Sequence, residues 1–121
     1  MNRYFRAVAL AFAAAAAFHA FRAIAPVAHD GSSSARHALF VLVNALVAVG
    51  LWVRPRWLFV PFALLTAQQL WSHGGAALAA WRDHGRVDVT SLAIVLLMPA
   101  TLTLLLLERR RQASGPHLHR R

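Results

Sequence analysis

The sequence predicts an all-α protein, a four-helix transmembrane bundle, from its composition, its apolar segments and its arginines. Of its 121 residues, 59% are hydrophobic and 14% are charged. A helix needs about 20 mostly apolar residues to cross a bilayer core, and four stretches have about that length. We expect spans at about residues 4–25, 37–53, 58–80 and 89–107. They would form a single membrane domain over residues 1–111, followed by a basic, disordered cytoplasmic tail over 112–121.

The first expected span, residues 4–25, is rich in alanine and is closed by Pro26. Small residues let helices approach closely, which favours a place for this span inside the bundle. The alternative is a signal peptide, because arginines precede an apolar run. Its one small-x-small cleavage site ends at Ala25, but Arg22 lies just before that site and Pro26 just after it, which disfavours cleavage. Cleavage would leave three spans.

The second and third expected spans flank a short arginine-containing turn at 54–57. Residues 37–53 contain no acidic residue and no arginine. The third span either stops at Gly74 and Gly75 or continues to Trp81. We expect the longer version, because it separates Trp57 and Trp81 by about 36 Å at 1.5 Å per residue. That separation suits a pair of aromatic anchors at the two membrane interfaces.

The fourth expected span, residues 89–107, contains no charged residue but carries Pro99 near its middle. A proline inside a helix removes one hydrogen bond and kinks the helix. Thr101 and Thr103 are expected to help satisfy the carbonyls that the proline frees.

The arginines predict that both termini are cytoplasmic. The formal net charge is +9, with no lysine, and the segments before the first span, between the second and third, and after the fourth are basic. With four crossings these segments share one side, which the positive-inside rule makes the cytoplasm. Their arginines are Arg3, Arg6, Arg54, Arg56, Arg109, Arg110, Arg111, Arg120 and Arg121. Nucleic acid is therefore not an expected partner, whereas the lipid bilayer is.

The composition also indicates a source and excludes some chemistry. Arginine without lysine, beside heavy use of alanine, is typical of GC-rich bacterial genomes, so we expect a multi-pass protein of the bacterial inner (plasma) membrane. The chain has no cysteine. Disulfides, thiolate metal sites and thiol redox catalysis are therefore excluded.

Polar side chains at membrane depth are the candidate functional residues, because burying them in lipid is costly. From the predicted spans, Asn44 and Gln69 fall near the midplane, with Gln68 beside them. His19 and His73 lie about a turn further out, and Arg22, His37 and Asp88 lie near the outer surface. Together they predict a polar pocket that opens outward. The candidates are His19, Arg22, His37, Asn44, Gln68, Gln69, His73 and Asp88.

Each candidate also has a structural interpretation. Asn44 and Gln69 are interpreted first as hydrogen-bonding clamps between helices. The long side chain of Arg22 reaches the outer headgroups from its position near the end of a span. His37 and Asp88 fall close to the surface, where polar residues need no special role. Function and structure are equally good interpretations of His73, which lies in the densest polar run at membrane depth.

The residues indicate binding rather than catalysis. No span holds paired carboxylates, and the chain has no Gly-rich phosphate loop and no Ser-His-Asp order. The leading hypothesis is an accessory or binding subunit, in a larger membrane complex or a homo-oligomer. One alternative is redox-associated: haem or another metal held by His19 and His73, or a quinone held by Arg22, Gln69 and His73. Another is a small-solute transporter acting as an oligomer.

Two known groups have this size and number of spans. Small multidrug transporters depend on a glutamate in the first span, where this chain has no acidic residue. The chain resembles more closely the DoxX-like group of small four-helix bacterial membrane proteins, through its length, its spans and the segments 44–54 and 68–75. That resemblance implies a four-helix fold with both termini inside and a link to respiratory or redox processes. It assigns no functional residue.

Overall fold

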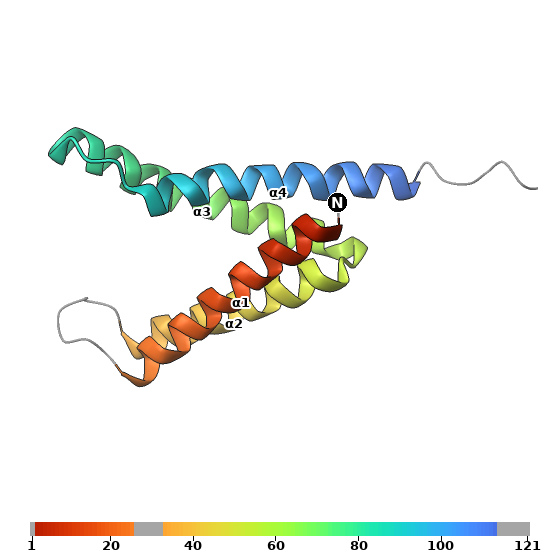
Figure 1. Ribbon diagram of the computed structural model, residues 1–121, viewed down its shortest axis with the longest axis horizontal. Coiled ribbons are helices and arrows are strands. Elements are labelled where there is room, and N and C mark those ends of the chain that lie inside the picture. Colours follow the sequence, from red (N-terminus) through yellow and green to blue (C-terminus); the bar gives the residue numbers. More distant parts are fainter. Residues whose placement is uncertain (1, 26–32, 114–121) are drawn as a thin grey trace, which may run out of the picture. The chain divides into compact units, whose positions relative to one another are not determined.

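The computed structural model describes residues 2–25 and 33–113, and these form four α-helices and one short 3₁₀ turn (Figure 1). The chain divides into two compact units, Met1–Pro55 and Arg56–Arg121. We call them the first and the second hairpin. The elements are α1 (Asn2–Ile24), α2 (Ser34–Val53), η1 (Arg56–Leu58), α3 (Phe59–His84) and α4 (Val89–Ala113). The all-helical fold with four helices is thus confirmed.

The helix ends refine the expected boundaries. α3 passes through Gly74 and Gly75 without a break and ends at His84, so the helix covers the longer of the two expected ranges. α4 runs to Ala113, which makes the first two residues of the expected disordered tail helical. The rest of that tail, and Pro26, lie outside the described residues.

In the first hairpin α1 lies antiparallel to α2 (Figure 1). Arg54 joins the end of α2 to the start of α1. Arg54 ends α2 in the left-handed conformation, with φ 56°, and its N–H donates to the Gly50 carbonyl. Its guanidinium donates to Asn2 Oδ1 at 2.9 Å and lies 5.7 Å from the ring centre of the buried Phe5. These contacts connect the start of α1 to the end of α2.

In the second hairpin α3 packs along α4 and extends beyond its start (Figure 1). Gly85 ends α3 with φ 59°, a conformation that side chains with a Cβ disfavour. Its N–H donates to the Trp81 carbonyl, and the Arg86 N–H donates to the Ala80 carbonyl. The chain then runs back along α3 to Val89, where α4 begins. The start of α4 therefore meets α3 several turns before its end.

Pro99 lies inside α4, as expected, and two threonines after it donate hydrogen bonds within the helix. A proline leaves the carbonyl four residues earlier, here that of Val95, without its helical donor. The Thr101 hydroxyl donates to Leu97 O and the Thr103 hydroxyl to Pro99 O, each at 2.8 Å. Each of these two hydrogen bonds goes to the carbonyl four residues before its own threonine, and neither goes to the Val95 carbonyl.

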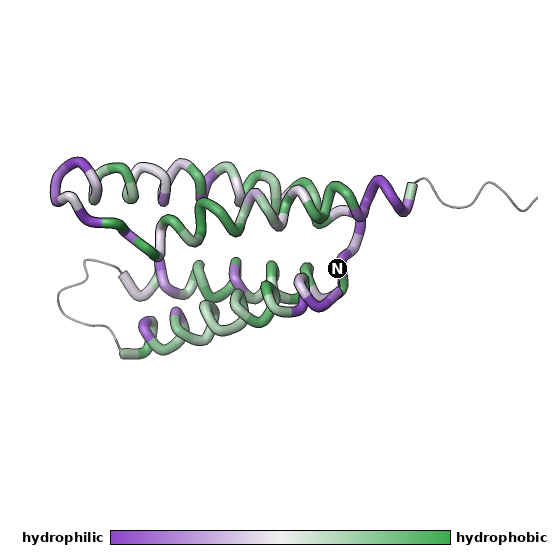
Figure 2. Tube along the Cα trace, turned by 45° about the horizontal axis from the view of Figure 1, so that its top comes forward, coloured by the Kyte–Doolittle hydropathy of each residue, from purple (hydrophilic) through white to green (hydrophobic). Residues whose placement is uncertain are grey.

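Three of the helices, α1, α2 and α4, are long and apolar enough to cross a membrane. Between 17% and 22% of their most apolar windows is buried inside the protein, so large apolar side chains such as Leu46, Leu96 and Ile24 face outward. Figure 2 shows the hydrophobic residues along the middle of the hairpins and hydrophilic ones at the α3–α4 turn and the end of α4. A water-exposed surface of this kind would aggregate, which indicates a membrane protein. α3 is outside this group, because its middle carries Gln68, Gln69 and His73.

Two glycine substitutions in α3 should have opposite effects on stability. No atom lies within 4 Å of a Cβ added at Gly85 or at Gly75, so the backbone conformation alone determines how each substitution changes the stability. Gly85→Ala should cost about 1 kcal/mol, because alanine disfavours a positive φ. Gly75→Ala should gain roughly 0.5–1 kcal/mol, because alanine is the better helix former. Unfolding of the detergent-solubilised variants in denaturant measures both changes, and equal signs would contradict the expectation.

Candidate functional site

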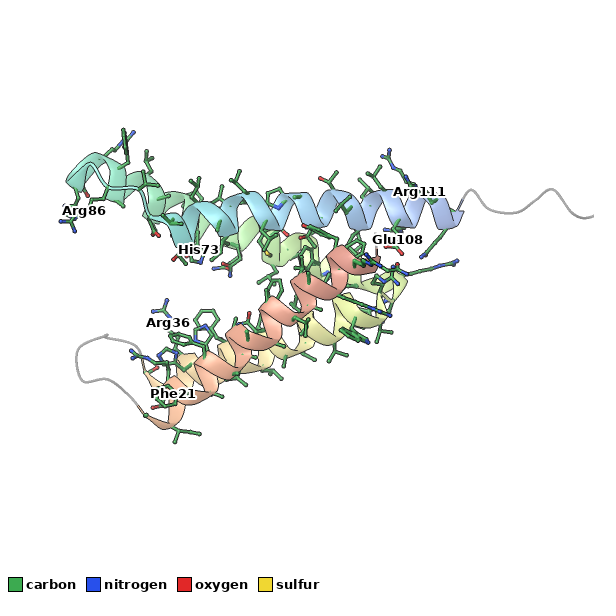
Figure 3. All side chains as sticks on the ribbon, in the orientation of Figure 1. Phe21, Arg36, His73, Arg86, Glu108 and Arg111 are labelled. Atoms are coloured by element: carbon green, nitrogen blue, oxygen red, sulfur yellow. The ribbon has the colours of Figure 1, made fainter. Side chains whose placement is uncertain are left out.

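A chain of three hydrogen-bonded side chains connects α3 to the start of α4. His73 Nδ1 lies 3.1 Å from the Ser91 hydroxyl, and that hydroxyl donates to Asp88 Oδ2 at 2.6 Å. Ser91 is buried, with 3% of its surface exposed, while His73 and Asp88 are half-buried. In Figure 3 His73 lies along the second hairpin, away from the Arg86 end. We call this set the α3–α4 relay.

The start of α4 explains why Ser91 and Asp88 meet. Asp88 is the N-cap of α4, since its carboxylate Oδ1 accepts the Ser91 N–H at 3.0 Å and its carbonyl accepts the Leu92 N–H. The capping residue and the third helical residue face each other, so the second carboxylate oxygen reaches the Ser91 hydroxyl. The relay thus consists of an ordinary N-cap of α4, Asp88 with Ser91, and of His73 from α3.

The charge of the Asp88 carboxylate orders the protons along the relay. Hydrogen bonds from the hydroxyl and then from the N–H of Ser91 hold the pKa of Asp88 below its ordinary value of 3.8. An ionised carboxylate can only accept, so the single Ser91 proton points toward Asp88. The serine oxygen must then accept from His73, which places a proton on His73 Nδ1. In a neutral ring Nε2 is left as an acceptor.

This order of groups differs from that of a hydrolase. In a catalytic triad the histidine lies between serine and carboxylate and removes the serine proton. Here the serine lies in the middle, its proton is directed to Asp88, and its side chain is buried. The relay orients His73, and it offers no nucleophile.

A second pair of candidate residues meets in the first hairpin. His19 of α1 and His37 of α2 lie with their Nδ1 atoms 3.0 Å apart. The Phe40 ring stacks on His19, with 5.0 Å between ring centres and 28° between planes. His37 is buried and His19 is half-buried. Figure 3 places Phe21 and Arg36, which flank this pair in sequence, at one end of the hairpin.

The remaining candidates make local contacts. Asn44 Nδ2 donates to the Phe40 carbonyl of its own helix at 2.7 Å. Gln69 Nε2 donates to Gln68 Oε1 at 2.9 Å, so these neighbours bind each other. Arg22 is half-buried, one turn after His19 on α1. The single outward pocket would need side chains of both hairpins, and it stays a prediction.

The structure gives each of the two histidines proposed as metal ligands a partner within its own hairpin. His19 lies beside His37, and His73 lies beside Ser91. A joint site of His19 and His73 stays a prediction. Ser91 is not among the eight candidates, although its position three residues after Asp88 is a recognisable capping pattern. Among residues 2–25 and 33–113, no group of three or more His, Cys, Asp or Glu side chains could hold a metal ion.

Three comparisons with known proteins gave no match. The chain matches no protein-family model, no curated protein and no solved structure.

Proposed function

We propose that the chain is a small multi-pass protein of the bacterial inner membrane, with four crossings and both termini in the cytoplasm. Three helices have the length and apolarity to cross. α3 has 26 residues, and the exposed Trp57 and Trp81 lie just before its start and near its end, as interfacial anchors would. The arginines gather in the segments that four crossings would place on one side.

The proposed activity is binding: an accessory subunit that holds a lipid-soluble quinol at His73, without catalysis of its own. The α3–α4 relay carries this proposal. It fixes the tautomer of a half-buried histidine and leaves Nε2 to accept a hydrogen bond. A membrane-soluble molecule with a hydroxyl group, such as a quinol, supplies the matching donor. The architectural resemblance to DoxX-like proteins, with their link to redox processes, favours the same ligand class.

The Asp88 carboxylate should make His73 bind a quinol more tightly than a lipid that donates no proton. When His73 shares or takes a quinol proton, positive charge develops on the ring. Ser91 connects the negative Asp88 carboxylate to that ring through two hydrogen bonds. A hydrogen bond with charge on one partner is about twice as strong as a neutral one. The site should therefore hold a proton-donating ligand most tightly.

The experiment is to purify the full chain in mild detergent and quantify the bound quinone by absorbance and mass spectrometry. His73→Ala should lower the quinone per protein about tenfold, the effect of losing roughly 1.4 kcal/mol of binding free energy. His84→Ala is the matched control, because His84 is exposed at the end of the same helix and should change nothing.

The same preparation separates the alternatives. Equal quinone in the wild type and in His73→Ala, at matched lipid content, would overturn the proposal. A Soret band lost in His73→Ala would replace it with haem binding. A larger membrane complex that co-purifies would identify the accessory role, and solute flux in liposomes would identify a transporter.

A further inference from the structure

The two histidines of the first hairpin face each other nitrogen to nitrogen. A five-membered ring with bonds of about 1.33 Å has a radius of about 1.1 Å. The distance between the His19 and His37 ring centres is 5.3 Å, close to the 3.0 Å between the Nδ1 atoms plus one radius on each side. The line joining the nitrogens therefore passes through both rings. The two lone-pair directions are collinear.

The described surroundings of the pair are aromatic. Phe40 stacks on His19, and Phe18 meets the same ring edge-on at 5.6 Å and 70°. Within the described residues of the first hairpin there is no Asp or Glu. Arg36 adds a positive charge, since its guanidinium carbon lies 5.7 Å from the Phe40 ring centre. His37 is close to the start of α2 at Ser34, so the site is a short distance from the helix ends.

We propose that His19 and His37 bind one copper(I) ion in linear two-coordination through their Nδ1 atoms. A metal–imidazole bond is about 2 Å long, so the nitrogens must move apart to about 4 Å, roughly 1 Å more than in the hydrogen-bonded pair. The displacement follows the line that the rings already share. The ion takes the place of the hydrogen-bonding proton, which moves to Nε2 of the same imidazole, so that each neutral ring binds through Nδ1 and no ring has to turn.

Coordination number and charge both select a monovalent ion. Copper(I) is a d¹⁰ ion that accepts two ligands in a line, whereas zinc requires four in a tetrahedron. Among the described residues the site supplies two ligands, and no third His, Cys, Asp or Glu joins them. The neighbouring Arg36, with no carboxylate among the described residues of the first hairpin, also makes a doubly charged ion less favourable than a singly charged one. This site is separate from the α3–α4 relay and does not depend on quinol binding.

The test is a copper(I) titration of the full chain in detergent, under ascorbate and without oxygen, against the indicator bicinchoninate. His29, His84, His117 and His119 are replaced by glutamine in every sample, so that only His19, His37 and His73 remain. This parent should bind one copper(I). His19→Ala or His37→Ala should weaken binding at least about 100-fold, because each removes one of two ligands. His73→Ala should bind as the parent does.

Two further measurements distinguish a metal site from a structural hydrogen bond. His37→Met should keep copper(I) binding, because a thioether is a soft ligand, while it removes the histidine pair. X-ray absorption should show two nitrogen neighbours at about 2 Å in the parent. Copper binding that survives His19→Ala, a parent that takes up no copper, or three or more nitrogen neighbours would each overturn the proposal.

Discussion

Replacing Leu96 by arginine should remove most of the protein from the membrane. Leu96 lies in α4 and is 64% exposed, so a soluble helical protein would accept arginine there at a cost below roughly 0.5 kcal/mol. In a transmembrane helix the same charge costs about 3 kcal/mol on insertion. The measurement is the fraction of protein that resists alkaline carbonate extraction. Leu96→Ala is the control and should stay in the membrane.

The corresponding change in α3 tests the fourth crossing. Leu64 is 70% exposed on α3, the helix whose polar middle keeps it apart from the three apolar spans. The chain has no cysteine, so a single introduced cysteine reports its own side of the membrane. With four crossings, a membrane-impermeant thiol reagent should label Arg86→Cys from outside and should not label Gln112→Cys. Adding Leu64→Arg should abolish the outside labelling of Arg86→Cys.

The labelling of the two cysteines without Leu64→Arg tests the topology itself. If α3 lies on the inner surface of the membrane and does not cross, α4 must cross in the opposite direction, and Gln112→Cys becomes accessible from outside. That result would contradict both the four crossings and the cytoplasmic C-terminus. A protein whose Leu64→Arg variant keeps the wild-type labelling at both cysteines would show that α3 does not need an apolar centre.

The helices could be predicted from the sequence because each apolar run has to satisfy its own backbone hydrogen bonds in lipid. The observed ends differ where polar residues continue a helix beyond its apolar run. α4 extends past Glu108 to Ala113, and α3 extends past Trp81 to His84. Apolarity marks where a span must be helical, but backbone hydrogen bonds and a left-handed glycine such as Gly85 decide where it ends.

The pairing of side chains could not be predicted in the same way, because it depends on the register of the hairpins. His19 contacts His37, and Asn2 contacts Arg54. Asn2 lies 17 residues before His19 on α1, and Arg54 lies 17 residues after His37 at the end of α2, as an antiparallel pair of helices requires. One register thus accounts for both contacts. The sequence shows that the two histidines lie on either side of one loop. It does not show how each helix is rotated about its axis, because the packing of buried residues such as Phe5 and Leu51 determines that rotation.

Replacing Ser91 by alanine should disrupt the α3–α4 relay more than any other single change in it. The Ser91 hydroxyl is buried and has a partner on each side, so its loss should cost about 2 kcal/mol of unfolding free energy. Denaturant unfolding in detergent measures this cost. Ser72→Ala, at an exposed serine beside His73 on α3, is the matched control and should fall within roughly 0.5 kcal/mol of the wild type.

The relay also predicts how stability depends on pH. Because the folded-state pKa of Asp88 is below its ordinary value of 3.8, its ionisation stabilises the fold fully above that value. The contribution is lost as the pH falls below 3.8 and through the folded-state pKa. Asp88→Asn should remove this part of the acid dependence while its amide oxygen still caps α4. Ser91→Ala should reduce it, because the strongest hydrogen bond to the carboxylate is gone.

Quinone content separates the orienting role of Ser91 from its stabilising role. If Ser91 positions His73, the folded Ser91→Ala protein should retain less quinone than Ser72→Ala at a pH where both are fully folded. Asp88→Asn should give an intermediate value, because the serine can still accept from His73 while the carboxylate charge is absent. A Ser91→Ala protein that is less stable yet binds quinone normally would show that the relay only holds α3 against α4. His73 would then be a structural residue, and the quinol site would have to lie elsewhere.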